Sequence, residues 1–214
     1  MIKRTLLLIV LGMLTFVVIG CGNVTDEGEA AAVVNEEVIT FTDFNLQVEN
    51  TKQMYEQQGI DIAEQGEEFL AMIKENVLNN MIDEKLLTQA SADYVVLEEE
   101  VEEQFLSVKS DFESEEQFHE ALELNNLTNE TFKERIQEQL KIDQFLSETM
   151  NEVVVTEEDL EEAYAQVKEM GEEDLDFEEI KPVLEQSVVQ QKKEEEFMRV
   201  LSQLKDQADI EIFI

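Results

Sequence analysis

Residues that end helices and form tight turns are scarce in this chain, and this scarcity restricts the fold more than any other feature. The 214 residues include a single Pro and seven Gly. Because β-sandwiches and β-barrels need frequent turns, which favour Gly and Pro, both architectures are excluded. Hydrophobic residues form 43% of the sequence, enough for a packed core. We therefore expect a mainly helical protein with one domain or two small ones.

The charge of the chain is extreme. Asp and Glu number 52 against 15 Lys and Arg, so the formal net charge is −37. A field of this sign repels polyanions, which excludes nucleic acid as a partner. Two explanations of the acidity stay open. It can keep an exported protein hydrated in a salty or alkaline habitat, or it can attract cationic stretches of a bound polypeptide.

The first 20 residues have the pattern of a secretory signal peptide. Two basic residues precede an apolar run over residues 5–19, which is shorter than the roughly 20 residues that a membrane-spanning helix needs. The run ends in Val-Ile-Gly-Cys at Cys21, which resembles the lipobox of bacterial lipoproteins. The motif implies cleavage before Cys21, a thioether lipid on this residue, and acylation, for example with palmitate, of the new amine.

A lipid at Cys21 would attach the protein to the extracytoplasmic face of a cell membrane. We interpret the source as a Gram-positive bacterium. Residues 21–31 read as a flexible tether to a folded domain over residues 32–214. Cys21 is the only cysteine, so no internal disulfide can form and stability must come from packing.

The two ends of the predicted domain have strand patterns. Residues 32–40 contain two β-branched runs separated by Asn35-Glu36-Glu37, which indicates an extended segment or a hairpin. Alternating isoleucines at residues 210–214 indicate a second short strand. Since strands this short need a partner, we expect the two ends to pair with each other.

Six or seven helices are expected between these ends. Apolar residues recur at helical spacing after each of several start signals. The predicted helices cover about residues 41–58, 69–92, 114–125, 128–150, 156–171 and 176–206, with capping residues at Ser114, Thr128, Thr156 and Asp176. Pro182 is expected in the first turn of the last helix or at a kink.

Three stretches, in order, resemble the SurA N-terminal-domain family of extracytoplasmic chaperones. They are AVVNEEVITFTDF at residues 32–44, VLNNMIDEKLLTQA at residues 77–90 and VVVTEEDLEEAY at residues 153–164. Glu36 stands where Gly is usual in the family. The resemblance implies a multi-helix peptide-binding domain, related in architecture to the chaperone part of trigger factor, with a short β pair. It also implies unfolded or exported polypeptides as partners.

Many family members carry an inserted parvulin prolyl isomerase domain of about 90 residues, the size of a small domain. Here residues 165–176 occupy the corresponding interval, which is too short for such a domain. The only histidine, His119, lies elsewhere, although parvulin sites use histidines. We therefore expect no isomerase activity.

Other chemistry is equally hard to assemble. The usual hydrolytic sites are excluded because the chain has one His, one Cys and no nucleophile motif. We therefore expect that this protein is not an enzyme. His119 lies among glutamates without a second His or Cys, and the glutamate clusters lack the order of a calcium loop. We therefore expect neither a metal nor a cofactor.

Polypeptide binding would require apolar side chains at the surface. Methionine adapts to varied partners, and mid-chain phenylalanines are further candidates. The candidate surface comprises Met54, Met72, Met81, Phe105, Phe112 and Met150. A scaffold or adaptor that uses one face for a fixed partner, or for a homodimer, is the alternative function. A solute receptor is disfavoured because paired α/β lobes are absent.

Overall fold

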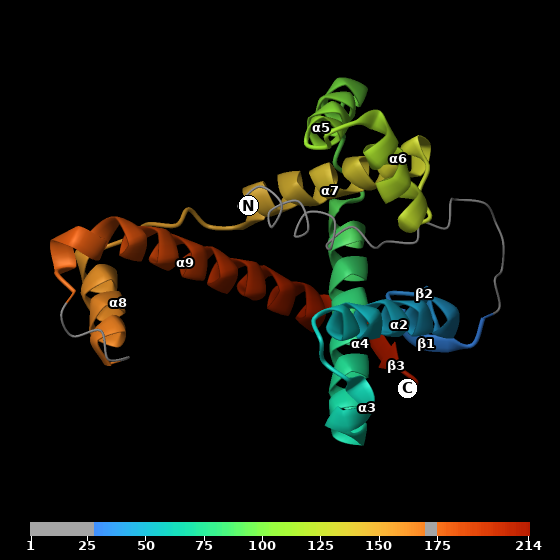
Figure 1. Cartoon of the computed structure of the whole chain (residues 1–214), viewed down its shortest axis with the longest axis horizontal. Helices are drawn as coiled ribbons and strands as arrows, with labels where there is room; N and C mark the ends of the chain where they lie inside the picture. Colours follow the sequence, from blue (N-terminus) through green and yellow to red (C-terminus); the bar gives the residue numbers. More distant parts are fainter. Residues whose placement is uncertain (1–27, 170–174) are drawn as a thin grey trace. The chain divides into compact units, whose positions relative to one another are not determined.

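The computed structural model describes residues 28–169 and 175–214 (Figure 1). In this part of the chain, eight helices accompany one three-stranded sheet, which confirms the mainly helical prediction. The chain divides into two compact units. Unit 1 contains residues up to Phe145 together with Gln207–Ile214, and unit 2 contains Leu146–Asp206.

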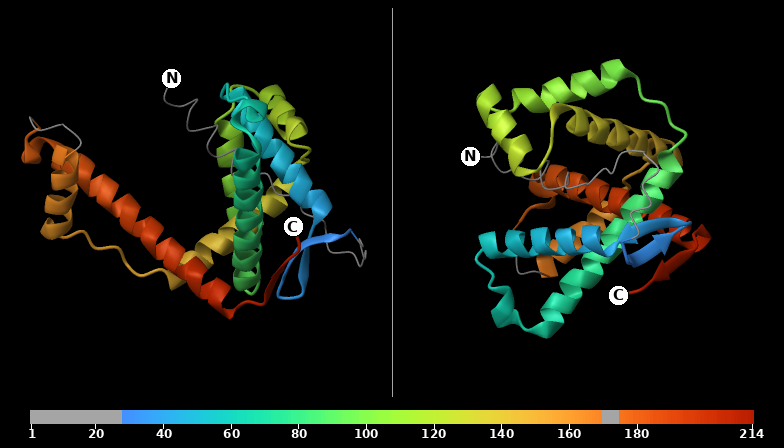
Figure 2. Two further views of the ribbon diagram at one scale, coloured as in Figure 1. Left: turned by 90° about the horizontal axis from the view of Figure 1, so that it is seen from below. Right: turned by 90° about the vertical axis from the view of Figure 1, so that its right-hand side faces the viewer.

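The sheet of unit 1 joins both ends of the predicted domain. Its antiparallel strands lie in the order β2-β1-β3, with β1 at Ala30–Val34, β2 at Glu37–Thr40 and β3 at Ile210–Ile212. Val33 lies opposite Val38 on one side and Glu211 on the other. The predicted hairpin and the predicted pairing of the two ends are both confirmed, and Figure 2 shows β3 beside β1.

The turn between β1 and β2 has a demanding backbone geometry. Asn35 and Glu36 have φ values of 49° and 73°, the left-handed region that a two-residue type I′ hairpin requires. The side chain of Asn35 holds this turn in place. Its amide nitrogen donates to Gln89 Oε1, and its Oδ1 accepts from the backbone nitrogen of Asp209, both at 2.9 Å. One side chain thus ties the turn to a helix and to the C-terminal strand region.

Three helices follow the hairpin. Helix α2 (Phe41–Gln57) begins at Thr40, whose hydroxyl accepts from the backbone nitrogen of Asp43. A single turn, α3 (Ile62–Gln65), leads to the long helix α4 (Glu67–Ser91). The rings of Tyr55 and Phe69 meet edge to face at 5.4 Å. Helices α2 and α4 bury apolar residues that include Phe44, Val48, Ile73, Val77, Leu78, Ile82, Leu86 and Leu87.

Helices α5 and α6 and most of helix α7 form a second packed group in unit 1, here called the aromatic lobe. They cover Glu98–Ser110, Glu115–Leu124 and Asn129–Thr149. The hydroxyls of Ser114 and Thr128 accept from backbone nitrogens at their helix starts, as predicted. The lobe buries Val96, Val101, Phe105, Phe118, Leu122, Phe132 and Ile136 together.

Unit 2 contains α8 (Glu157–Glu169) and most of α9 (Phe177–Gln207). Thr156 and Asp159 form the predicted reciprocal cap of α8. Helix α9 starts after Asp176, whose carboxylate accepts from the backbone of Glu178. Pro182 lies inside α9, beyond its first turn. Only Leu160, Leu184 and Val188 form the buried cluster between these two helices, surrounded by partly buried apolar residues.

Two helices are absent from the ranges predicted above. Helix α3 is a single turn, and α5 begins after Leu97, which has no side chain able to cap a helix. The carboxylate of Glu100 accepts from the backbone nitrogen of Leu97 instead, at 2.9 Å. The predicted signal peptide of residues 1–20, Cys21 and most of the predicted tether lie outside the described residues. The tether prediction was wrong at its end, because Ala30 and Ala31 belong to strand β1, where Ala31 is fully buried.

Candidate functional site

The candidate apolar residues differ widely in accessibility. Met54 on α2 and Met72 on α4 have 49% and 42% of their surfaces exposed. Met81 and Met150 are half-buried, and Phe112 packs against the aromatic lobe while staying partly open. Met150 belongs to unit 2 and the other four to unit 1. Met54 and Met72 are therefore the members with the largest exposed apolar surface.

Phe105 belongs to the core of the aromatic lobe, with 6% of its surface exposed. Its ring lies 5.6 Å from that of Phe118 and 5.9 Å from that of Phe132, while Lys133 Nζ lies 4.6 Å from its centre. Such ring contacts stabilise packing. We therefore assign Phe105 to the core and leave it out of the candidate surface.

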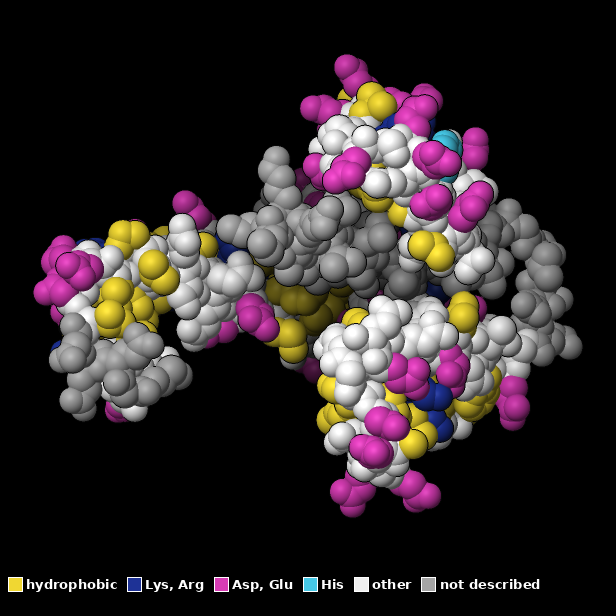
Figure 3. Space-filling model, in the orientation of Figure 1, with side chains coloured by type: hydrophobic (Ala, Val, Ile, Leu, Met, Phe, Trp, Pro, Cys, Tyr) yellow, Lys and Arg dark blue, Asp and Glu magenta, His cyan; other side chains and the backbone are white. Residues whose placement is uncertain are grey.

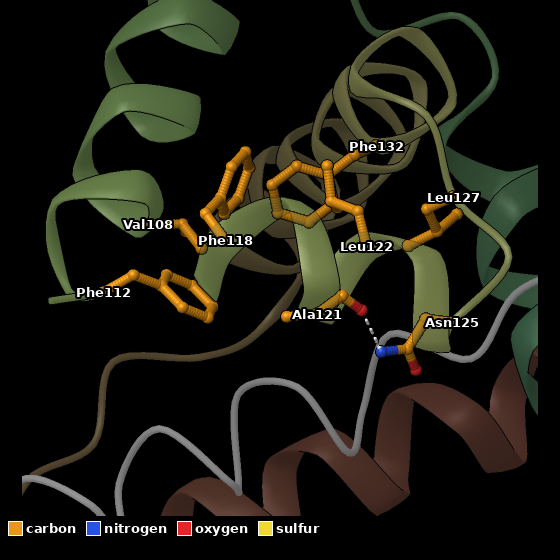
Figure 4. Close-up of a pocket in the computed structure, with 8 residues that line it drawn as sticks. All are labelled: Val108, Phe112, Phe118, Ala121, Leu122, Asn125, Leu127 and Phe132. Atoms are coloured by element: carbon orange, nitrogen blue, oxygen red, sulfur yellow. Dashed lines mark hydrogen bonds between the residues drawn. The ribbon is translucent and has the colours of Figure 1, made fainter. Parts of the chain in front are cut away.

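Figure 4 shows a small apolar cavity in this lobe. Rings of Phe112, Phe118 and Phe132 line it, and the Asn125 amide at its edge donates to the Ala121 carbonyl at 2.7 Å. Its volume is about 10 Å³, roughly the space that one water molecule requires. The cavity is too small to accept an amino-acid side chain without movement of its walls.

Sequence reasoning missed most of the exposed apolar side chains. Besides Met54 and Met72, the exposed large apolar residues are Val38, Leu46, Val95, Leu97, Leu106, Leu124, Val154, Val183, Met198, Ile212, Phe213 and Ile214. They occur in both units, and Figure 3 shows apolar side chains at the surface over α8 and α9. Helical periodicity could have found some of them. Leu106, for example, directly follows the buried Phe105 and so points to another side of α5.

Carboxylates border some of these apolar residues. Leu106 lies with Glu98, Glu99, Glu102 and Glu103 around one shallow depression on α5. Acidic side chains also cover much of the visible surface of α5 and α6 in Figure 3. An apolar contact at this place would therefore lie in a negative potential, which favours cationic partners.

Three charged groups meet inside unit 1, between α4 and α7. Arg135 of α7 is buried with 7% of its surface exposed, and Glu84 of α4 is half-buried. Burial, and next the negative charge of Glu138, raise the pKa of Glu84 to about 8, against the opposing effects of Lys85 and Arg135. Burial lowers the pKa of Arg135, against its two glutamates.

Polar contacts hold residues 149–159 along α9 within unit 2. Lys192 Nζ donates to Asp159 at 2.7 Å and to the Val154 carbonyl at 3.1 Å. The Lys192 bond, and next that from Thr156, lower the pKa of Asp159 to about 2. Glu196 accepts from the backbone and side chain of Asn151, and these bonds together with Arg199 lower its pKa. Both carboxylates are therefore ionised at neutral pH.

The described residues, 28–169 and 175–214, contain neither a metal-binding cluster nor a helix able to span a membrane. These residues contain no group of three or more His, Cys, Asp or Glu placed to hold a metal ion. His119 is exposed on α6, with its ring 5.9 Å from that of Phe118. No helix among residues 28–169 and 175–214 has the length and apolar content needed to cross a bilayer.

The helical architecture with a small sheet agrees with a family of helical domains to which the sequence can be compared. Residues 2–146 match the model of the SurA-like N-terminal domain. The chain belongs to this family, and the resemblance inferred from its motifs is confirmed.

Three curated relatives of the chain have the same name, Foldase protein PrsA. The chain is similar to a protein named Foldase protein PrsA from Caldanaerobacter subterraneus subsp. tengcongensis, with 33% identity over 150 residues that cover 66% of this chain and 44% of the relative. Proteins of the same name from Clostridium botulinum strain Langeland and Clostridium perfringens strain SM101 are 27% and 26% identical over 186 and 187 residues. These alignments cover 78% and 80% of this chain.

The chain spans about half the length of the curated relatives that it matches, since the three alignments cover 44%, 55% and 54% of them. No solved structure matches the chain.

Proposed function

We propose that this protein is a membrane-anchored extracytoplasmic chaperone that binds unfolded or exported polypeptides and has no prolyl isomerase activity. The observation that carries the proposal is the contrast between its surface and its interior. Large apolar side chains are exposed on α2, α4 and other elements, whereas the cavity of the aromatic lobe has a volume of only about 10 Å³. Membership of the SurA-like N-terminal domain family supports the same function.

Scattered exposed side chains suit weak binding at several points. Burying the exposed half of one Met or Leu contributes on the order of 1 kcal/mol. Several such contacts made by one extended chain add through their high local concentration. A polypeptide can thus be held without a deep pocket, and it can leave when it folds. The acidic surroundings of Leu106 would favour segments that combine apolar and cationic residues.

Two features support the absence of isomerase activity and the lipid anchor. Residues 165–176, between the end region of α8 and the start of α9, are too few to form a domain of about 90 residues. The lipobox-like motif supports a lipid at Cys21. Lipid labelling of the native chain beside a Cys21→Ser variant tests the anchor, because labelling of the variant would contradict it.

An aggregation assay tests polypeptide binding. The full chain in lipid nanodiscs should delay the aggregation of several unrelated unfolded proteins at stoichiometric amounts. A double change, Met54→Gln with Met72→Gln, should weaken binding by about tenfold, since about 1.4 kcal/mol of apolar contact is lost. The double change Gln53→Ser with Asn76→Ser, at exposed positions of the same helices, should have no effect.

Each outcome has a defined meaning. Unchanged aggregation with the native chain would overturn the chaperone proposal and favour a scaffold or adaptor with one fixed partner. Equal activity of the two double variants would remove Met54 and Met72 from the binding surface. Acceleration of prolyl isomerisation in a test peptide would overturn the non-catalytic part of the proposal. A size measurement across concentrations tests whether two copies associate.

A further inference from the structure

Strand β3 forms one edge of the sheet in unit 1, and in the described part of the chain β1 is its one neighbouring strand (Figure 2). On the inner side, the backbone nitrogen of Phe213 donates to the Ala31 carbonyl at 2.9 Å. Successive residues of an antiparallel strand turn their backbone groups to opposite sides. The N–H and C=O groups of Ile210 and Ile212 therefore point outward, away from β1.

The opposite edge of the sheet, formed by β2, is less suited to a further strand. By the same alternation, Val38 turns its backbone groups outward. Two residues later, Thr40 caps α2 and the chain leaves the sheet. Strand β3 offers the outward groups of two residues, Ile210 and Ile212, and its bonding to β1 continues to Phe213. The outer side of β3 is therefore the better template for strand addition.

One face of the sheet is incompletely covered at this edge. Ile39, Ala32 and Ile212 form a row across the three strands. Ile39 and Ala32 have 3% and 0% of their surfaces exposed, whereas Ile212 has 52%. Burial along the row thus stops at β3. An apolar residue opposite Ile212, on a strand added beside β3, would cover this side chain and extend the apolar face of the sheet.

The other face of the same edge is negative. Glu211 alternates with Ile210 and Ile212, so it lies on the opposite face, where it is exposed. A basic residue opposite Glu211 would form a favourable cross-strand pair. A second copy of this chain is a poor occupant, because each copy has a formal net charge of −37 and the two repel. Both faces are complemented by a segment that alternates apolar and basic residues.

We propose that the outer edge of β3 binds such a segment of an extended polypeptide as a fourth, antiparallel strand of the sheet. This inference rests on the proposed chaperone function, for which it specifies one manner of binding. The apolar residues of the segment exchange backbone hydrogen bonds with Ile210 and Ile212, and a basic residue lies beside Glu211. Backbone bonds do not depend on side-chain identity, so one edge can hold many segments, while the alternating side chains set the preference among them.

Hydrogen exchange resolved to single amides tests this manner of binding. The full chain in lipid nanodiscs is mixed with a synthetic peptide of alternating Lys and Val. At a peptide concentration ten times its Kd, exchange at the outward amides of Ile210 and Ile212 should slow by about tenfold, because about one site in ten stays free. The amide of Phe213, which already donates to β1, serves as the internal reference and should change little.

Two methylated peptides separate backbone bonding from adhesion of side chains. Methyl groups on the Val nitrogens remove the donors that face β3 and should weaken binding by about tenfold. Methyl groups on the Lys nitrogens of the backbone lie on the far side of the added strand and should leave the Kd unchanged. Equal binding of the two methylated peptides would overturn the proposal.

A pair of charge reversals tests the negative face. Glu211→Lys should weaken binding of the Lys and Val peptide by about tenfold, because an attractive cross-strand pair becomes a repulsive one. Glu120→Lys, at an exposed position of α6, changes the net charge equally and should bind the peptide like the native chain. The same loss in both variants would assign the effect to overall charge and overturn the pairing with Glu211.

The outcomes also separate this inference from the function on which it rests. A native chain that delays aggregation of unfolded proteins, but shows no peptide-dependent slowing at Ile210 and Ile212, keeps the chaperone function and overturns the β3 site. Slowing at these amides without any delay of aggregation would overturn the chaperone function and leave the edge as a site for one fixed partner. Slowing that depends on protein concentration in the absence of peptide would mean that a second copy occupies the edge, which also overturns the proposal.

Discussion

The aromatic lobe and unit 2 are both small helical assemblies, but different interactions hold them together. In the lobe, Phe118 has 2% of its surface exposed and lies within about 6 Å of three other phenylalanine rings, those of Phe105, Phe112 and Phe132. In unit 2 the buried cluster is smaller, and two side chains of α9 hold the segment before α8: Lys192 donates to the Val154 carbonyl, and Glu196 accepts from the backbone nitrogen of Asn151. The chain thus combines an assembly based on apolar packing with one in which hydrogen bonds of charged side chains supplement a smaller apolar cluster.

The largest expected effect on stability comes from removing the ring of Phe118 from the aromatic lobe. Phe118→Ala should lower the free energy of unfolding of unit 1 by about 3–5 kcal/mol, because a buried ring is replaced by a cavity. Chemical denaturation monitored by circular dichroism measures this change. Phe213→Ala, at a position with 53% exposure, is the matched control and should cost less than about 1 kcal/mol. Equal losses in the two variants would refute the central role of Phe118.

A smaller change, of opposite sign, is expected where backbone geometry limits unit 1. Glu36 has a φ of 73°, which strains any residue with a Cβ atom. Glu36→Gly should therefore increase the free energy of unfolding by about 1 kcal/mol. Glu37→Gly, one residue later in β2, should decrease it, because glycine weakens a regular strand. A stabilising effect of both changes would mean that charge removal, and not the turn, is responsible.

The smallest effect concerns the exposed polar contacts of unit 2. The pKa of Asp159 is lowered to about 2, so its support for the start of α8 is complete above its ordinary value of 3.8 and is lost as the pH falls toward 2. Amide exchange at residues 156–160 should therefore accelerate over this interval. Asp159→Asn should remove this dependence at the helix start. Simultaneous loss of protection in α6 would show that acid acts on the whole chain and not on this contact.

Local signals in the sequence predicted the ends of the helices and strands well. Ser114, Thr128 and Thr156 accept the backbone bonds that their positions indicate, since a capping residue acts within three residues of itself. The pairing of β1 with β3 followed from the need of short strands for a partner. Helix α5 was not predicted because the residue before it, Leu97, has no capping side chain. The carboxylate of Glu100 supplies the cap instead.

Accessibility depended on contacts that no local pattern contains. Phe105 and Met72 are both apolar residues on helices, yet one is buried and the other open. The difference arises from Phe118 and Phe132, which reach Phe105 from two other helices. Similarly, Glu84 lies within one of the recognisable family motifs, but its raised pKa depends on Glu138, 54 positions further along the chain.

The hydrogen bonds of Asn35 indicate the order in which the strands of the sheet pair during folding. Its side chain and backbone contact Asp209, 174 positions away, and β1 obtains its second neighbour only from the same distant region. Strand β2 follows β1 directly in the sequence, whereas β3 lies near the other end of the described chain, so the β1–β2 hairpin can form while the second edge of β1 is still unpaired. Closing so wide a loop is slow compared with forming the intervening helices. We therefore expect pairing of β3 with β1 to be the last step of folding. Until that step, the unpaired edge of β1 is exposed to aggregation.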